Sequence, residues 1–164
     1  MSETYVECLI KAKQPTAAKF GKILLIVLTV IFGAAMMVLP VTMLAALATG
    51  FGAYFLNMYT DLEYEYLYLD KEIVVDKVMA KTRRKRVATY SVDRIEILAP
   101  IHSYHLDNYK NRNVKIKDIS IGEELKPDLR YVMYYEGGEK IILSPSPEMV
   151  KALKNVAPRK VFND

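Results

Sequence analysis

The sequence predicts an α+β membrane protein, in which a transmembrane hairpin of two helices is followed by seven β-strands and a C-terminal helix. Three observations lead to this prediction. Residues 23–60 contain no Asp, Glu, Lys or Arg, and the other 126 of the 164 residues hold all 42 charged side chains. Residues 62–143 alternate apolar and polar side chains over several short runs, as strands do. Residues 147–156 place apolar side chains at helical spacing.

The composition excludes several other classes of protein. A buried helix of a soluble globule rarely reaches half the length of the uncharged run, so a simple soluble fold is excluded. Gly and Pro number only seven each and no low-complexity repeat is present, which excludes a fibrous or disordered chain. Cys8 is the only cysteine, so neither an intrachain disulfide nor a Cys-rich metal site can form.

Residues 1–19 precede the hairpin and are expected to form an N-terminal tail in the cytoplasm. Residues 5–10 are rich in strand-favouring side chains, and at helical spacing they also form one apolar face. We expect this segment to dock on the domain that follows the hairpin as an added strand, which would cover a sheet edge. An interfacial helix is the alternative.

The hairpin is expected over residues 20–60. A single helix of 38 uncharged residues would be about 57 Å long, whereas the hydrocarbon core of a bilayer is about 30 Å thick. Pro40 lies near the middle of the run, and proline disfavours helix at the residue before it. We therefore expect two spans, at about residues 20–38 and 41–59, with a tight turn between them.

The flanking charges predict the orientation of the hairpin. Four lysines precede the first span and the turn at Pro40 has no charge, so the positive-inside rule places both termini in the cytoplasm of a two-pass protein of the cell membrane. These lysines are Lys11, Lys13, Lys19 and Lys22. A cleavable signal peptide ending at Ala46-Leu47-Ala48 is the alternative, and we reject it because the apolar stretch is far longer than a signal sequence requires.

Small residues recur at four-residue spacing in the second span and could face small residues of the first. Such stripes let two membrane helices approach closely. The candidate packing residues are Gly33, Ala45, Ala46, Thr49, Gly50 and Ala53, with Ala34 beside them. The alternative interpretation is equally strong, because alanine and glycine are common in all membrane helices.

Residues 61–164 are expected to form one domain with its own core. Two-residue turns at Asp70-Lys71 and Gly137-Gly138 separate neighbouring strands. A phase change near Lys117-Asp118 indicates a bulge. The expected strands are residues 62–69, 72–78, 86–90, 94–99, 114–121, 129–136 and 139–143.

The chain should end in a helix over residues 147–156. Ser146 is expected to cap it, Pro147 suits its first turn, and Pro158 prevents its continuation. The apolar stripe that should face the core consists of Met149, Ala152, Leu153 and Val156.

Seven strands and a final helix are the element order of a pleckstrin-homology-like (PH-like) domain. The run EYEYLYLDKEIVVDKVMAKTRRKRVATYSVDRIEIL, residues 63–98, and the TYVECLI start at residues 4–10 resemble a family of small Firmicute membrane proteins with a transmembrane hairpin and a bacterial PH-like domain of unknown function. The resemblance implies that the strands form a barrel with the last helix over one open end. It implies no ligand.

The densest cluster of charge lies at residues 81–86. Each Lys or Arg near an anionic membrane contributes about 1 kcal/mol to binding, so this cluster is a candidate contact for anionic lipid headgroups. The alternative is a solvated turn. Nucleic acid is not expected, because the domain has a net charge of only +2 and no aromatic residues interleave the basic run. The candidate residues are Lys77, Lys81, Arg83, Arg84, Lys85 and Arg86.

Other chemistry-bearing residues give weaker signals. His102, His105 and Asp107 could bind a metal, but no further Cys or His completes a site, so ordinary loop histidines are expected. Palmitoylation of Cys8 is possible, and an unreactive thiol is expected instead. No catalytic motif is present and the spans carry no ionisable residue other than tyrosine, so we expect neither an enzyme nor a transporter, and no cofactor.

Two functions follow from this sequence. The first is a membrane-anchored interaction module that binds a protein partner, or a second copy of itself, at the inner face of the membrane. The second is a sensor or binder of anionic lipid headgroups through residues 81–86. The sequence identifies neither ligand.

Overall fold

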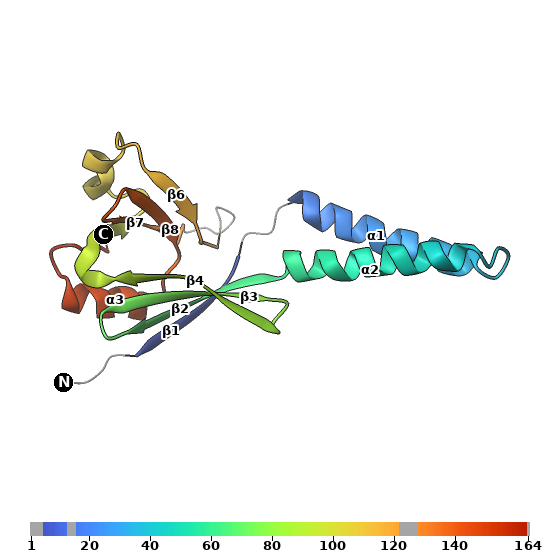
Figure 1. The fold of residues 1–164 in the computed structure, drawn as a ribbon. Coiled ribbons are helices and arrows are strands. Elements are labelled where there is room, and N and C mark those ends of the chain that lie inside the picture. The colour runs from blue at the N-terminus through green and yellow to red at the C-terminus, as the bar shows by residue number, and fades with distance from the viewer. Residues whose placement is uncertain (1–4, 13–15, 122–127, 164) are drawn as a thin grey trace. The chain divides into compact units, whose positions relative to one another are not determined.

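The computed structural model describes residues 5–12, 16–121 and 128–163. The chain divides into two compact units. The hairpin unit consists of residues 14–62 and 79–83, and the sheet unit consists of residues 1–13, 63–78 and 84–164. Figure 1 shows that the hairpin unit is mainly helical and that the sheet unit combines strands with a helix.

The hairpin unit is built from α1 (Thr16–Ala35) and α2 (Thr42–Thr60), which pack side by side along their length (Figure 1). The partly buried residues of α1 recur every three or four positions, as in a coiled-coil seam. They are Ala18, Gly21, Lys22, Leu25, Leu28, Thr29, Phe32 and Ala35. Each helix therefore presents one stripe to the other and leaves the rest of its apolar surface exposed.

The helix boundaries differ from the expected spans. The first helix begins at Thr16 rather than residue 20 and ends at Ala35 rather than residue 38, whereas α2 begins at Thr42, within one residue of the expectation. Pro40 explains why α1 ends early. Proline disfavours helical backbone at the residue before it, so the helix stops short of Leu39. The amide of Leu39 still bonds to the carbonyl of Ala35 at 2.9 Å, which closes the last turn.

Among the described residues, one helix is long and apolar enough to cross a membrane. This helix is α1, with a mean hydropathy of 1.9 over its best window and none of that window buried. Signal sequences near an N-terminus pass the same test. The second helix does not reach the same hydropathy, because it carries Asn57 and several threonines and tyrosines. The second span therefore stays a prediction.

The first sheet of the sheet unit has the order β1-β2-β3-β4. Its strands are β1 (Val6–Lys11), β2 (Leu62–Leu69), β3 (Glu72–Met79) and β4 (Arg83–Ser91). The expected docking of the N-terminal segment as a strand is confirmed, because β1 pairs antiparallel with β2 from Val6↔Tyr68 to Lys11↔Glu63. The expected turn at Asp70-Lys71 is also confirmed, with both residues at positive φ.

The second sheet has the order β5-β7-β8-β6. Its strands are β5 (Ile95–Pro100), β7 (Tyr131–Tyr135), β8 (Glu139–Leu143) and β6 (Lys115–Asp118), and β6 runs parallel to β8. Gly137 and Gly138 make the expected hairpin turn, with φ of 99° and 81°. Two short 3-10 helices, Val92–Arg94 and Tyr104–Tyr109, lie in the connections on either side of β5.

Two expected strands differ from those of the structure by three residues at one end. The run over residues 114–121 is not one bulged strand: β6 ends at Asp118, whose carboxylate accepts hydrogen bonds from Ser120 N at 3.0 Å and Ser120 Oγ at 2.7 Å. This local turn reverses the alternation. Conversely, β4 begins at Arg83 and not at Arg86, so most of the basic cluster lies on a strand.

The expected seven-stranded barrel is not what the described residues form. They form eight strands in two separate four-stranded sheets, and no ladder joins the two sheets. The addition of β1 to the outer edge of β2 explains the eighth strand. A side chain links the sheets instead, because the Tyr66 hydroxyl donates to Ile119 O and accepts from Ser144 N.

The core lies between these sheets and α3 (Pro147–Val156), the expected C-terminal helix. Ser146 caps α3, with its Oγ accepting from Met149 N at 3.2 Å, as the sequence predicts. The buried stripe of α3 differs by one position from the expectation: Val150 is buried, whereas Val156 is 42% exposed. The stripe is therefore Met149, Val150, Ala152 and Leu153.

Candidate functional site

The basic cluster begins at a tight turn between β3 and β4. Ala80 and Lys81 occupy it with φ of 47° and 56°, and Thr82 N donates to Met79 O at 3.1 Å. Two-residue turns with positive φ favour Asn and Gly, because other side chains disfavour the left-handed conformation. Ala80 and Lys81 adopt it nevertheless. The amide of Ala80 donates to the carbonyl of Asp61 at 2.8 Å. This bond ties the turn to the C-terminal end of α2 within the hairpin unit.

Two of the five basic residues at 81–86 are engaged by carboxylates of the first sheet. Arg84 Nη1 lies 2.9 Å from Glu65 Oε2, and Arg86 Nε lies 3.4 Å from Asp76 Oδ1. Both arginines of β4 therefore neutralise acidic residues of the same sheet, Glu65 on β2 and Asp76 on β3, and are less available to an external anion. The sequence does not show these pairs, although the alternation of LEYEYLYL places Glu63 and Glu65 on the face opposite the tyrosines.

The remaining basic residues are exposed and have no ion pair with a described residue. Lys81 lies in the turn, and Arg83 and Lys85 alternate along β4 with the paired arginines, which places them on the other face of the strand. Lys81 and Arg83 belong to the hairpin unit, whereas Lys85 belongs to the sheet unit. Lys77, on β3, is half-buried. The structure thus divides the six candidate residues into two paired arginines, three exposed cations without an ion pair to a described residue, and one half-buried lysine.

The carboxylate of Glu65 is buried between a second carboxyl group, that of Glu7, and the guanidinium of Arg84. Burial is the main cause that raises its pKa, and the neighbouring Glu7 carboxyl raises it further, whereas the Arg84 guanidinium opposes the shift. Glu65 Oε2 accepts no aligned hydrogen bond from the described residues, despite its short distance to Arg84. In contrast, a hydrogen bond from the Tyr5 hydroxyl at 2.9 Å lowers the pKa of Glu7.

A polar cavity of about 390 Å³ lies at the base of the hairpin unit. Lys22 Nζ donates to Asn57 Oδ1 at 2.5 Å across the two helices. The residues that line the cavity are Lys19, Lys22, Ile23, Asn57, Thr60 and Asp61. In the sequence, Lys19 and Lys22 indicate only the orientation of the hairpin, and nothing local to them indicates that Asn57 lies opposite.

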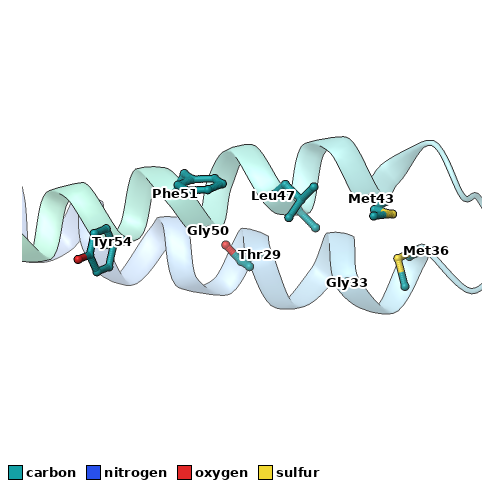
Figure 2. A pocket seen from close by; sticks show the side chains of 9 residues that line it. Thr29, Gly33, Met36, Met43, Leu47, Gly50, Phe51 and Tyr54 are labelled. Carbon is teal, nitrogen blue, oxygen red and sulfur yellow. The ribbon is translucent and has the colours of Figure 1, made fainter.

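The helices of the hairpin unit also leave an apolar groove of about 690 Å³ (Figure 2). Thr29 Oγ1 donates to Thr49 Oγ1 at 3.0 Å across the seam, and a Cβ added at Gly50 would lie 3.6 Å from Thr29 Cγ2. Gly33 lines the groove with nothing within 4 Å of an added Cβ. The other candidate packing residues, Ala45, Ala46 and Ala53, are partly buried, and Ala34 is exposed.

A third groove, of about 540 Å³, lies in the sheet unit beside α3. Its lining combines apolar side chains from the start of β7 with two lysines of α3. Lys154 Nζ donates to Asn163 Oδ1, whereas no described residue pairs with Lys151. The lining residues are Leu129, Tyr131, Pro145, Pro147, Val150, Lys151, Lys154, Asn155 and Asn163.

The structure separates the potential metal ligands. His102 Nε2 lies 3.4 Å from Asp128, whereas Asp107 pairs with Lys110 at 2.6 Å. The ring of His105 stacks on Phe162 with centroids 3.7 Å apart. Among the described residues, no three His, Cys, Asp or Glu side chains gather to hold a metal. Each of these three groups thus has another partner.

Cys8 lies on β1, half-buried against the core. Burial raises the pKa of its thiol. A thiol with a raised pKa forms less thiolate at neutral pH and reacts more slowly.

Comparison with known proteins identifies a family but no function. The family model described as "Bacterial PH-like domain (DUF6106)" matches residues 2–163. No curated protein matches the chain. No solved structure matches it either. Because the family model covers nearly every residue, from β1 through both helices of the hairpin to the segment after α3, the chain belongs to this bacterial PH-like domain family.

Proposed function

We propose that this protein is a non-enzymatic, membrane-anchored PH-like module whose basic turn, Lys81 and Arg83, contacts anionic lipid headgroups. The observation that carries the proposal is the hydrogen bond from Ala80 N to Asp61 O at 2.8 Å. It keeps the turn beside the end of α2, and the end of a spanning helix lies at the level of the headgroups. Two cations that form no ion pair with a described residue are held there and gain attraction from an anionic surface, which decays within about 10 Å.

The proposal includes a hairpin that crosses the cell membrane twice, with both termini in the cytoplasm. The exposed apolar residues on both helices support it, because water would not tolerate so large an apolar surface. Reporter fusions at residues 2 and 164 test the topology. Signals from the cytoplasm at both positions are expected, and signals from opposite sides would show a single crossing.

Lipid contact can be measured on the full chain in phosphatidylcholine nanodiscs. Spin-labelled phosphatidylglycerol that is immobilised by the protein gives a separate spectral component, from which the association constant relative to phosphatidylcholine follows. The wild type should prefer phosphatidylglycerol, and Lys81→Gln with Arg83→Gln should lower the preference by about fivefold or more, since each cation contributes about 1 kcal/mol.

A matched control removes two positive charges elsewhere. Lys151→Gln with Lys154→Gln lie on α3 and should leave the preference unchanged. The preference of the wild type should also fall at high salt, because surface charges are screened. An equal effect of both double variants would refute a specific role for the basic turn.

A protein partner, or a second copy of the chain, is the second candidate ligand. The groove beside α3 favours it, because apolar walls with a few polar groups suit an extended peptide. Recovery of a stoichiometric partner from detergent extracts by the wild type, but not by Lys151→Glu, would support this function. Equal recovery by both proteins would place the partner elsewhere.

A further inference from the structure

We propose that the cavity at the base of the hairpin unit binds the headgroup of a single phospholipid that combines a phosphodiester with a hydrogen-bond donor. Lys19 and Lys22 would hold the phosphodiester, and the Asp61 carboxylate would accept the donor. The inference rests on the membrane anchoring of the proposed function, but not on the basic turn.

The helices bring the required groups to one place. Lys19 and Lys22 are three residues apart on α1, and Asn57 and Asp61 are four residues apart at the end of α2, so each pair shares one helix face. The hydrogen bond from Lys22 Nζ to Asn57 Oδ1 fixes one ammonium group at the mouth. Lys19 is exposed and has no partner among the described residues. Two cations therefore converge on a cavity large enough for a small ligand.

The position of Asp61 is fixed by its own backbone. Its amide donates to Asn57 O at 3.0 Å, and its carbonyl accepts from Ala80 N at 2.8 Å. The hydroxyl of the neighbouring Thr60 is engaged by Leu56 O at 2.9 Å. No described residue bonds to the Asp61 carboxylate, so it is available as an acceptor at the cavity, at an end of α2 that two backbone hydrogen bonds hold in place.

The mixture of charges selects the class of ligand. Inorganic phosphate would be attracted by the lysines but repelled by the carboxylate. A headgroup with a hydrogen-bond donor beyond its phosphodiester suits both the lysines and the carboxylate. The ammonium of phosphatidylethanolamine and the hydroxyls of phosphatidylglycerol are such donors. Phosphatidylcholine has no such donor. Ile23, which begins the uncharged run, lines the cavity on its apolar side, which suits a lipid rather than a soluble ester.

The test measures immobilised spin-labelled lipids with three headgroups around the full chain in phosphatidylcholine nanodiscs. The wild type should retain phosphatidylethanolamine and phosphatidylglycerol about fivefold more strongly than phosphatidylcholine. Lys19→Gln with Lys22→Gln should bring phosphatidylethanolamine close to equality with phosphatidylcholine, whereas phosphatidylglycerol should keep the part of its preference that the basic turn supplies. Asp61→Ala should remove the advantage of phosphatidylethanolamine over phosphatidylcholine, because it deletes the acceptor for the headgroup's donor and leaves both lysines in place.

Further variants separate this inference from the basic-turn proposal. Lys81→Gln with Arg83→Gln should leave the preference for phosphatidylethanolamine intact, because that lipid carries no net charge. Lys19→Gln alone, at an exposed position, repeats the test if the double variant does not fold. Equal retention of all three lipids by the wild type, or an unchanged preference in Lys19→Gln, would overturn the inference. Loss of the phosphatidylethanolamine preference in excess inorganic phosphate, but not in chloride of the same ionic strength, would do the same, by showing a site for the free anion.

Discussion

The guanidinium of Arg84 lies 2.9 Å from the carboxylate of Glu65, whose side chain is only 2% exposed. Arg84 itself is 65% exposed, so the pair joins a solvated cation to a buried anion. This arrangement removes Arg84 from the set of cations available to lipid. It also makes the stability of the first sheet depend on residues that the sequence alone presents as a binding cluster.

Replacement of Arg84 should therefore affect stability rather than lipid binding. Arg84→Gln leaves the buried Glu65 carboxylate without its cation and should lower the free energy of unfolding by about 1 kcal/mol, a value reduced by the exposure of Arg84. Arg83→Gln, one residue earlier, should leave stability unchanged. Thermal unfolding of the β-structure in detergent, followed by circular dichroism, compares the two variants. Equal midpoints would contradict the distinction.

The raised pKa of Glu65 predicts a particular dependence of stability on pH. The folded state holds the proton on Glu65 more tightly than the unfolded state does, so this residue's contribution to stability falls as pH rises above the unfolded value of about 4.3 and through the raised folded value. The stability of the wild type relative to Glu65→Gln should accordingly decrease as pH rises from about 4.3 towards neutrality. An increase over that range would show that the attraction to Arg84 dominates.

Asp128 should show the opposite dependence. Its hydrogen bonds with Arg130 Nε at 2.8 Å and Nη2 at 2.7 Å are the main cause that lowers the pKa of its carboxyl to about 2. The stabilisation is complete above the unfolded value of about 3.9 and is lost as pH falls towards 2. Asp128→Asn should cost about 1–2 kcal/mol at neutral pH and much less at low pH, as measured by unfolding at both. A cost independent of pH would contradict the ionic contribution.

The strand β1 should be protected from hydrogen exchange in the full chain. Its six residues pair with β2 over the whole of their length, so amides that point towards β2 should exchange more slowly than those of an unstructured peptide. Deletion of residues 61–164 should abolish the protection. Mass spectrometry of a peptide that covers residues 5–11 measures it, and free exchange in the intact chain would show that β1 is not docked.

Two substitutions on α3 test which of its faces packs against the sheets. Leu153 is fully buried, so Leu153→Asp should destabilise the sheet unit by several kcal/mol through an unpaired buried charge. Val156→Asp, at a position that the sequence pattern assigned to the same stripe, should cost about 0.5 kcal/mol, as surface substitutions do. Similar losses at both positions would place Val156 in the core. The measurement is the shift in the thermal midpoint.

Local chemistry in the sequence was sufficient to predict most of the elements. Alternation located the strands from residue 62 onward, because burial of one face requires a period of two. Pro40, Ser146 and the Gly137-Gly138 pair located a break, a cap and a turn, because each restricts the backbone at its own position. The strand β1 was predicted from its side chains and from the unpaired edge that a sheet would offer it.

The tertiary structure decided which residues meet. In the sequence, nothing distinguishes Arg84 and Arg86 from free cations. Only the assembly of β2, β3 and β4 into one sheet brings Glu65 to Arg84 and Asp76 to Arg86. Lys22 and Asn57 are 35 residues apart and meet because α1 and α2 pack side by side. The two sheets of the described residues also meet through tertiary contacts, because the Tyr66 hydroxyl bonds to Ile119 O and Ser144 N and no ladder joins the sheets. Periodicity fixes the face on which a residue lies, whereas its partner depends on contacts between segments that are distant in the chain.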